Sequence, residues 1–182
     1  MTKIYIIRHC AASGQEPGAE LTETGMAQAV ELSGFLSELG IERIVSSPYT
    51  RAVQSIAPLA EALAVEIETD ERLKERILSS GNLTDWFERL KSTFDDHDLV
   101  LEGGESSRQA LDRISQVAGE LEKSGQTAAI VTHGNIMALL LSRYVEGFGF
   151  EGWRALSNPD VFVLTDAPDG KSGERLWNED SR

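Results

Sequence analysis

The sequence predicts an α/β fold, a three-layer sandwich in which a mostly parallel sheet carries helices on both faces. Short apolar runs typical of buried strands alternate with amphipathic helical patterns along the chain. Two of these runs lead directly into histidines, His9 and His133. The 182 residues, 41% of them hydrophobic, contain no repeat, linker or low-complexity segment, so we expect one domain, 1–182.

The expected strands are short and form one alternating series. They lie near residues 3–8, 43–46, 65–69, 127–132 and 160–166. The first helix begins at Thr22 and ends at Leu39, because Gly40 supplies a left-handed C-terminal cap. After the last strand, Asp169-Gly170 predicts a hairpin turn that returns the chain to Leu176-Trp177.

Caps and apolar spacing predict further helices. Ser47 and Pro48 suit the N-cap and first residue of a helix that follows strand 43–46. Ser106 and Gln109 form a capping box at the start of a helix over 106–124. Asn82 is expected to cap a helix that places apolar and aromatic residues at helical spacing. These residues are Leu83, Trp86, Phe87, Leu90 and Phe94.

Cationic and imidazole side chains follow three of the strands. Arg8 and His9 end strand 3–8, His133 follows strand 127–132, and Arg51 lies in the first turn of the helix after strand 43–46. Because ligand sites of open α/β sheets gather where strands end, we expect these side chains to converge. Guanidinium groups and helix N-termini both favour anions. The sequence therefore predicts a phosphate site at this edge of the sheet.

The motifs around these residues resemble those of the histidine phosphatase superfamily, the phosphoglycerate-mutase-like proteins. The similar strings run nearly end to end in the family order: Ile6-Ile7-Arg8-His9, Leu21-Thr22-Glu23-Thr24-Gly25 with Gln28-Ala29, Ser46-Ser47-Pro48 with Arg51-Ala52, Glu71-Arg72-Leu73-Lys74-Glu75, Gly103-Gly104-Glu105-Ser106 and Thr132-His133-Gly134. The chain departs from the family pattern at Cys10, where Gly is usual, and at Ala11, Ala12 and Gln15, where Glu, Thr and Asn are common. Gln15 either contacts the phosphate or lies at a polar loop tip.

The chemistry of the residues agrees with the roles that the resemblance implies. A neutral imidazole is a competent nucleophile, so His9 is expected to take the phosphoryl group. Arg8, Arg51 and His133 can stabilise the charge on its oxygens. The resemblance implies that Glu75 protonates the leaving group.

Composition alone would place Glu75 in a solvated cluster of charges, residues 70–76. In the family, the segment after the acid overhangs the pocket, and here that segment is 77–102. We expect the aromatic residues of this segment to pack in the core rather than contact substrate. Trp86 is the residue whose position best distinguishes the two alternatives.

Hydrolysis of a small phosphomonoester through a phosphohistidine is the favoured function. Phosphoglycerate-mutase-type phosphoryl transfer is an alternative, although the insertion between motifs is shorter than resemblance to the glycolytic mutases requires. A non-catalytic phosphate-ligand sensor is the alternative from another class. A cysteine-dependent phosphatase is disfavoured, because the His-Cys-x5-Arg string that begins at His9-Cys10 has Glu16 where arginine is required. The thiol of Cys10 is expected to be open to oxidation.

Charge and apolar content restrict partners and location. The net charge of −13 and pI near 4.6 disfavour nucleic acid and acidic membranes as partners. The longest apolar stretch in the C-terminal half, residues 136–141, is too short to span a bilayer, and no signal peptide is evident, so we expect a cytoplasmic protein. Asp95, Asp96, His97 and Asp98 are consecutive rather than spaced on a helical face. We therefore expect no metal and no cofactor.

Overall fold

The computed structural model describes residues 2–167 and 170–178, and six strands in these ranges form one sheet in the order β3-β2-β4-β1-β5-β6. The strands are β1 (Lys3–Arg8), β2 (Arg43–Ser46), β3 (Ile67–Thr69), β4 (Ala128–Thr132), β5 (Asp160–Ala167) and β6 (Gly170–Trp177). The first four pair in parallel, whereas β5 and β6 are antiparallel. The prediction of a mostly parallel sheet is confirmed.

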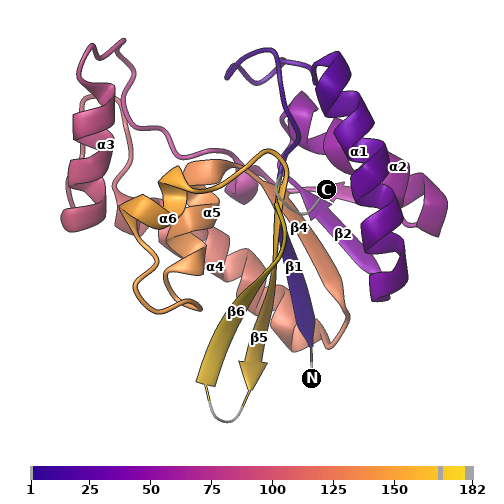
Figure 1. The fold of residues 1–182 in the computed structure, drawn as a ribbon. Helices are drawn as coiled ribbons and strands as arrows, with labels where there is room; N and C mark the ends of the chain where they lie inside the picture. Colours follow the sequence, from indigo (N-terminus) through magenta and orange to yellow (C-terminus); the bar gives the residue numbers. More distant parts are fainter. Residues whose placement is uncertain (1, 168–169, 179–182) are drawn as a thin grey trace.

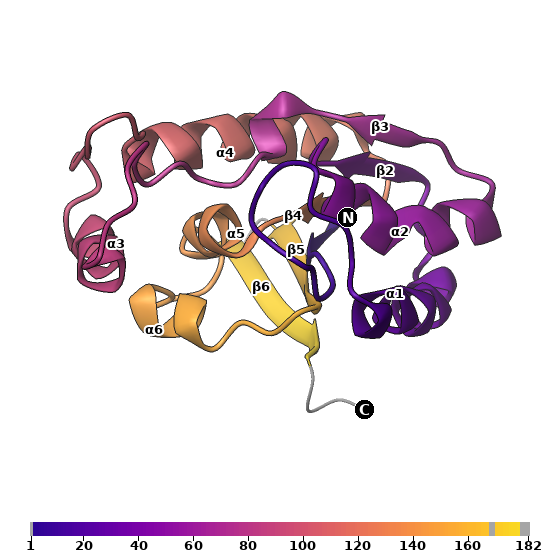
Figure 2. The ribbon, with the colours of Figure 1, turned by 90° about the horizontal axis from the view of Figure 1, so that it is seen from above.

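Helices cover both faces of this sheet (Figure 1). They are α1 (Glu23–Leu36), α2 (Thr50–Leu63), α3 (Trp86–Asp95), α4 (Ser107–Ser124), α5 (Gly134–Leu141) and α6 (Phe150–Arg154). On one face α1 and α2 pack together with Tyr5 and Ile7, and on the other α4 and α5 pack with Ile4 and Ile6. Successive side chains of a strand point to opposite faces of the sheet, so alternate residues of β1 pack in the cores on its two faces. Figure 2 shows α3 set apart from the sheet, beside α6.

Several caps lie where the sequence predicts them. The hydroxyl of Thr22 accepts from the amide of Gly25 at 3.0 Å and caps α1. Ser106 and Gln109 make both hydrogen bonds of the capping box that opens α4. Gly40 ends the short 3-10 helix Ser37–Leu39 in the left-handed region, with φ of 68°, where a Cβ would be strained.

Other boundaries differ from the prediction. Helix α2 begins at Thr50 and not at Pro48, and its N-cap is Tyr49. Helix α3 begins at Trp86 with Asp85 as its N-cap, so Asn82 does not cap it. Strand β3 covers only Ile67–Thr69 of the predicted 65–69. The predicted return strand to Trp177 is present as β6, while Asp169 of the predicted turn lies outside the described residues.

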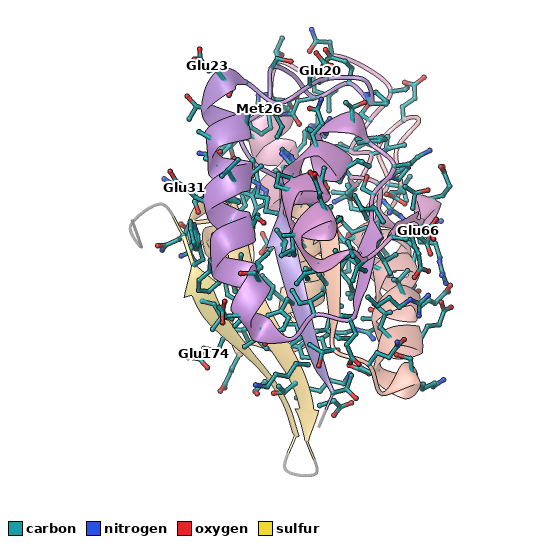
Figure 3. The ribbon with its side chains drawn as sticks, turned by 90° about the vertical axis from the view of Figure 1, so that its right-hand side faces the viewer. Glu20, Glu23, Met26, Glu31, Glu66 and Glu174 are labelled. Carbon is teal, nitrogen blue, oxygen red and sulfur yellow. The ribbon has the colours of Figure 1, made fainter. Side chains whose placement is uncertain are left out.

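Much of the acidic charge lies on the outer surface of the chain. Figure 3 labels five exposed carboxylates on or near the face covered by α1 and α2: Glu20, Glu23, Glu31, Glu66 and Glu174. Met26 of α1 lies among them and is also exposed. Among the residues that the structure describes, no helix is both long enough and apolar enough to cross a membrane.

Candidate active site

Three parallel strands deliver the predicted residues to one edge of the sheet. Strand register places Arg8 opposite Thr132. The amide of His9 extends this ladder by donating to the carbonyl oxygen of Thr132 at 3.1 Å. The rings of His9 and His133 consequently lie side by side, with centroids 5.2 Å apart.

His9 is held with one defined ring nitrogen directed at the site. Its Nδ1 lies 2.7 Å from the carbonyl oxygen of Cys10, which can only accept, so Nδ1 carries the hydrogen. The lone pair of Nε2 accepts from Nε of Arg51 at 3.2 Å. Burial lowers the pKa of His9 to about 4, and the charges of Arg51 and Arg8 act in the same direction. The imidazole is therefore neutral at pH 7, and its Nε2 can act as a nucleophile when a ligand takes over the hydrogen bond from Arg51.

Two guanidinium groups lie in this part of the structure, that of Arg51 buried and that of Arg8 partly buried. Arg51 is 1% exposed and donates from Nη1 to the carbonyl oxygen of Glu16 at 2.9 Å. Arg8 donates from Nη1 to the carbonyl oxygen of Leu156 at 3.0 Å. Burial lowers the pKa of both groups, yet arginine remains charged in proteins. Arg8 lies against Gly134, where a Cβ would come within 2.9 Å of the guanidinium, so only glycine fits without displacement.

His133 is anchored at one ring nitrogen and open at the other. Its Nε2 lies 2.8 Å from the hydroxyl of Ser47. Burial holds the pKa of His133 well below its usual range, and the positive surroundings act in the same direction, so this ring is also neutral. Its Nδ1 is buried without a hydrogen-bond partner.

Unsatisfied buried polar atoms concentrate at this edge of the sheet. Five side-chain atoms among the described residues are buried without a partner, and three of them are Nε of Arg8, Nδ1 of His133 and Oδ1 of Asn135. Such atoms are rare in folded proteins and call for a ligand or water. A bound phosphoryl group would supply acceptors for the first two, which connects the cluster to anion binding.

Glu75 joins the loop after β3 to the start of α5. Its Oε1 accepts from the amides of Arg76 at 2.7 Å and Ile136 at 3.0 Å, and its Oε2 accepts from the amide of Asn135 at 3.0 Å. The carboxylate is half-buried at a helix N-terminus, where negative charge is stabilised. Assignment of Glu75 to a solvated charge cluster, which composition alone favours, is therefore wrong.

The backbone that carries Glu75 is fixed from α4. Arg113 donates from Nη1 to the carbonyl oxygens of Arg72 and Lys74, at 2.7 Å each. Its Nη2 pairs with Glu105 at 2.6 Å. Arg113 therefore positions the segment 72–75 relative to the sheet edge.

A cavity of about 490 Å³ opens beside these residues, and its polar lining includes Arg8, Gln15, Glu75 and Asn135. Gln15 is exposed and lines the same cavity as Arg8 and Glu75. The apolar lining comes from Leu78, Trp86, Leu90 and Trp153. Trp86 is 50% exposed, so the expectation that the aromatic residues of segment 77–102 pack in the core is wrong for this residue.

Cys10 follows His9 directly in the chain, but its side chain lies in the core. Its side chain is completely buried in the core formed with α1 and α2. Its amide donates to the hydroxyl of Ser55 at 2.8 Å, which fixes the loop after His9. The expectation that this thiol is open to oxidation is wrong, because a reactive thiol must be accessible. Within the described ranges, no group of three or more His, Cys, Asp or Glu could hold a metal ion.

Sequence reasoning missed four residues that shape the site. Ser47 was assigned to a helix cap, although its hydroxyl contacts His133. Asn135 follows the histidine motif and could have been included from that position alone. Arg113 and Trp153 carry no local signal, because only the fold brings α4 and α6 to the cavity.

Comparison with known families gives a match over nearly the whole chain. The model of the histidine phosphatase superfamily (branch 1) matches residues 4–179. A probable phosphoglycerate mutase of Salmonella paratyphi A is 27% identical over 174 residues, which cover 84% of this chain and 78% of that protein. Phosphoserine phosphatase 1 of Hydrogenobacter thermophilus is 27% identical over 150 residues, covering 73% and 71%. An uncharacterised protein of Mycobacterium tuberculosis is 32% identical over 81 residues, and this alignment covers 41% of the chain and only 40% of that relative.

Solved structures agree with the fold. The complex of mycobacterial glucosyl-3-phosphoglycerate phosphatase with inorganic phosphate has a TM-score of 0.78 at 24% identity, covering 98% of this chain and 97% of the other. Phosphoserine phosphatase from Entamoeba histolytica in complex with 3-phosphoglyceric acid has a TM-score of 0.79 at 20% identity, covering 98% of each chain. At these identities the likeness establishes the α/β fold alone.

Proposed function

Because this chain belongs to the histidine phosphatase superfamily, we propose that it hydrolyses small phosphomonoesters through a phosphohistidine on His9. The proposal rests mainly on the protonation and orientation of the His9 imidazole. This imidazole is buried and neutral, Nδ1 is fixed by the Cys10 carbonyl, and the lone pair of Nε2 faces the guanidinium of Arg51. A nucleophile with this orientation needs no base to activate it.

Substrate capture relies on the surrounding donors. Arg8 and Arg51 supply two positive charges, and the unpartnered Nε of Arg8 is available to a phosphoryl oxygen. The unpartnered Nδ1 of His133 is a further donor in the tautomer in which Ser47 donates to Nε2 and Nδ1 carries the hydrogen. These donors are already positioned in the folded chain, so stabilising the transition-state charge costs little reorganisation. Loss of one such donor typically costs about 3 kcal/mol, or two decades in rate.

The first chemical step transfers the phosphoryl group to His9. Nε2 forms a bond to phosphorus as the bond from phosphorus to the ester oxygen breaks, and Glu75 donates a proton to the leaving oxygen. The three amides that contact Glu75 fix its carboxyl group at the start of α5, where it lines the cavity. The proposal requires this carboxyl group to carry the proton that it passes to the leaving oxygen.

The second step returns the enzyme to its starting state. Glu75, now a carboxylate, accepts a proton from water, which attacks phosphorus and releases inorganic phosphate with the neutral imidazole of His9. Transfer to a second substrate hydroxyl in place of water would give mutase-type chemistry through the same first step. The similarity to a probable phosphoglycerate mutase supports keeping this alternative.

A panel of phosphomonoesters, assayed between pH 5 and 8 with a chelator present, tests the proposal. We expect release of inorganic phosphate at an unchanged rate when EDTA is added, because the protein's own cations supply the charge that the reaction needs. Binding of the esters without any phosphate release would favour the phosphate sensor. Phosphorylation of an added alcohol in place of phosphate release would favour the mutase-type reaction.

A further inference from the structure

The cavity has an apolar as well as a polar lining. The apolar part comes from Leu78, Trp86, Leu90 and Trp153, and the same cavity is lined by Arg8, which is proposed to hold phosphate. The segment 77–87 also contains three of the six large hydrophobic side chains that are exposed among the described residues, namely Ile77, Trp86 and Phe87. Trp86 both lines the cavity and is half exposed, so its indole is an apolar contact surface within the cavity.

The indole of Trp86 contacts other aromatic rings of α3 and α6 through a network of ring contacts. Its centroid lies 5.6 Å from that of Phe87, with the planes 88° apart. Phe87 in turn packs edge-on to Phe150 at 5.3 Å, and Phe150 lies 5.5 Å from Trp153. This network connects α3 to α6 and orders Trp86 before any ligand binds, so less entropy is lost when a ring packs on it.

Two charged side chains of the cavity lining, Arg76 and Glu75, already make hydrogen bonds within the protein. Arg76 also lines the cavity, but its guanidinium donates to the carbonyl oxygen of Glu105 and to the hydroxyls of Thr93 and Ser107. Both oxygens of Glu75 are occupied by backbone amides. The third charged residue among the described residues that line the cavity is Arg8, which is proposed to hold the phosphoryl group. No further charged side chain of this lining is therefore left to bind a carboxylate or an ammonium on the alcohol.

We propose that this cavity selects phosphomonoesters of uncharged alcohols that carry a planar aromatic ring, with the ring packed on Trp86. The inference rests on the proposed function, because it identifies the substrate class of the same site. The volume of about 490 Å³ is within the range of small-molecule sites and accommodates a phosphoryl group with one ring. Aromatic packing of this kind supplies roughly a tenfold gain in affinity.

The test compares 2-phenylethyl phosphate with n-butyl phosphate and O-phosphoserine. The first two have alkyl leaving groups of similar acidity, so a difference in kcat/KM reports contact with the ring. We expect kcat/KM to be about tenfold higher for the phenylethyl ester than for the butyl ester, and O-phosphoserine to be the poorest. Trp86→Ala should remove the preference, Trp86→Phe should retain most of it, and Ile77→Ala, an exposed neighbour outside the cavity, should leave it unchanged.

Calorimetric binding of benzylphosphonate and butylphosphonate, which cannot be hydrolysed, separates this inference from the proposed function. Tighter binding of benzylphosphonate that is lost in Trp86→Ala supports the aromatic site even if no ester is hydrolysed. Hydrolysis of all three esters with equal kcat/KM, a preference for O-phosphoserine, or a ring preference that persists in Trp86→Ala would overturn the inference and leave the phosphatase proposal intact.

Discussion

Glu75→Gln separates two roles that the structure gives to one carboxylate. The side chain accepts three backbone hydrogen bonds and is also the proposed proton donor. Glutamine keeps the shape and one carbonyl oxygen, which can still accept from the amides of Arg76 and Ile136. Its NH₂ group then faces the amide of Asn135, which loses its acceptor. The change therefore affects both stability and proton transfer.

The two effects have different magnitudes and separate readouts. One buried amide without an acceptor costs about 1–3 kcal/mol, and each kcal/mol lowers Tm by roughly 2–4 °C in a chain of this size. Loss of general acid catalysis should slow alkyl esters by about 10²–10⁴-fold. Nitrophenyl phosphate needs little protonation of its leaving group and should lose less than about tenfold. The assay compares kcat/KM for the two ester types well below the Tm of the variant.

Glu71→Gln provides a matched control, because Glu71 lies in the same segment with its side chain exposed and paired with Lys74 at the surface. It should change Tm and both rates little. Equal losses on alkyl and aryl esters in Glu75→Gln would refute the acid role. Glu75 would then be a residue that positions the start of α5.

Four further outcomes follow from the structure. After correction for substrate ionisation, kcat/KM for aryl esters should show no His9 titration near pH 6.5, since the pKa of His9 is about 4 when folded. Unfolding free energy measured in urea should fall as pH drops from about 6.5 towards 4, because unfolded His9 takes up a proton that the folded state excludes; a constant value would contradict this. Gly134→Ala places a Cβ 2.9 Å from the Arg8 guanidinium and should lower kcat/KM by about 10–100-fold, whereas Gly119→Ala, with open space around it, should retain full activity. Cys10→Gly should keep kcat while costing roughly 1 kcal/mol in chemical denaturation, since the thiol packs in the core; lost activity would assign it a role in the site.

The sequence was sufficient for the sheet and for the residues that follow its strands. Arg8, His9 and His133 occupy strand ends, and parallel register alone brings such positions to one edge. Arg51 lies in the first turn of α2, as its motif implied. Strand period and cap chemistry are local properties, which explains why they could be read without the fold.

The positions of Ser47, Trp86 and Arg113 depend on tertiary contacts, which local sequence patterns do not predict. Ser47 has the chemistry of a helix cap, but its hydroxyl contacts His133, and α2 begins later at Thr50. Trp86 has helical spacing typical of a core residue, yet α3 lies away from the sheet (Figure 2). The side chain of Trp86 is consequently half exposed. Arg113 reaches the loop of Glu75 from α4, and no sequence pattern records such a contact.

The central claim is that His9 carries the phosphoryl group, and trapping the phosphoenzyme tests it most directly. Rapid quenching with ³²P-labelled aryl phosphate should yield a labelled protein whose bond is labile in acid and stable in alkali, the behaviour of a phosphoramidate. The label should be absent from His9→Ala and should be present at near wild-type amounts in Cys10→Gly. An acid-stable phosphoenzyme that persists in His9→Ala would contradict the mechanism proposed for this chain.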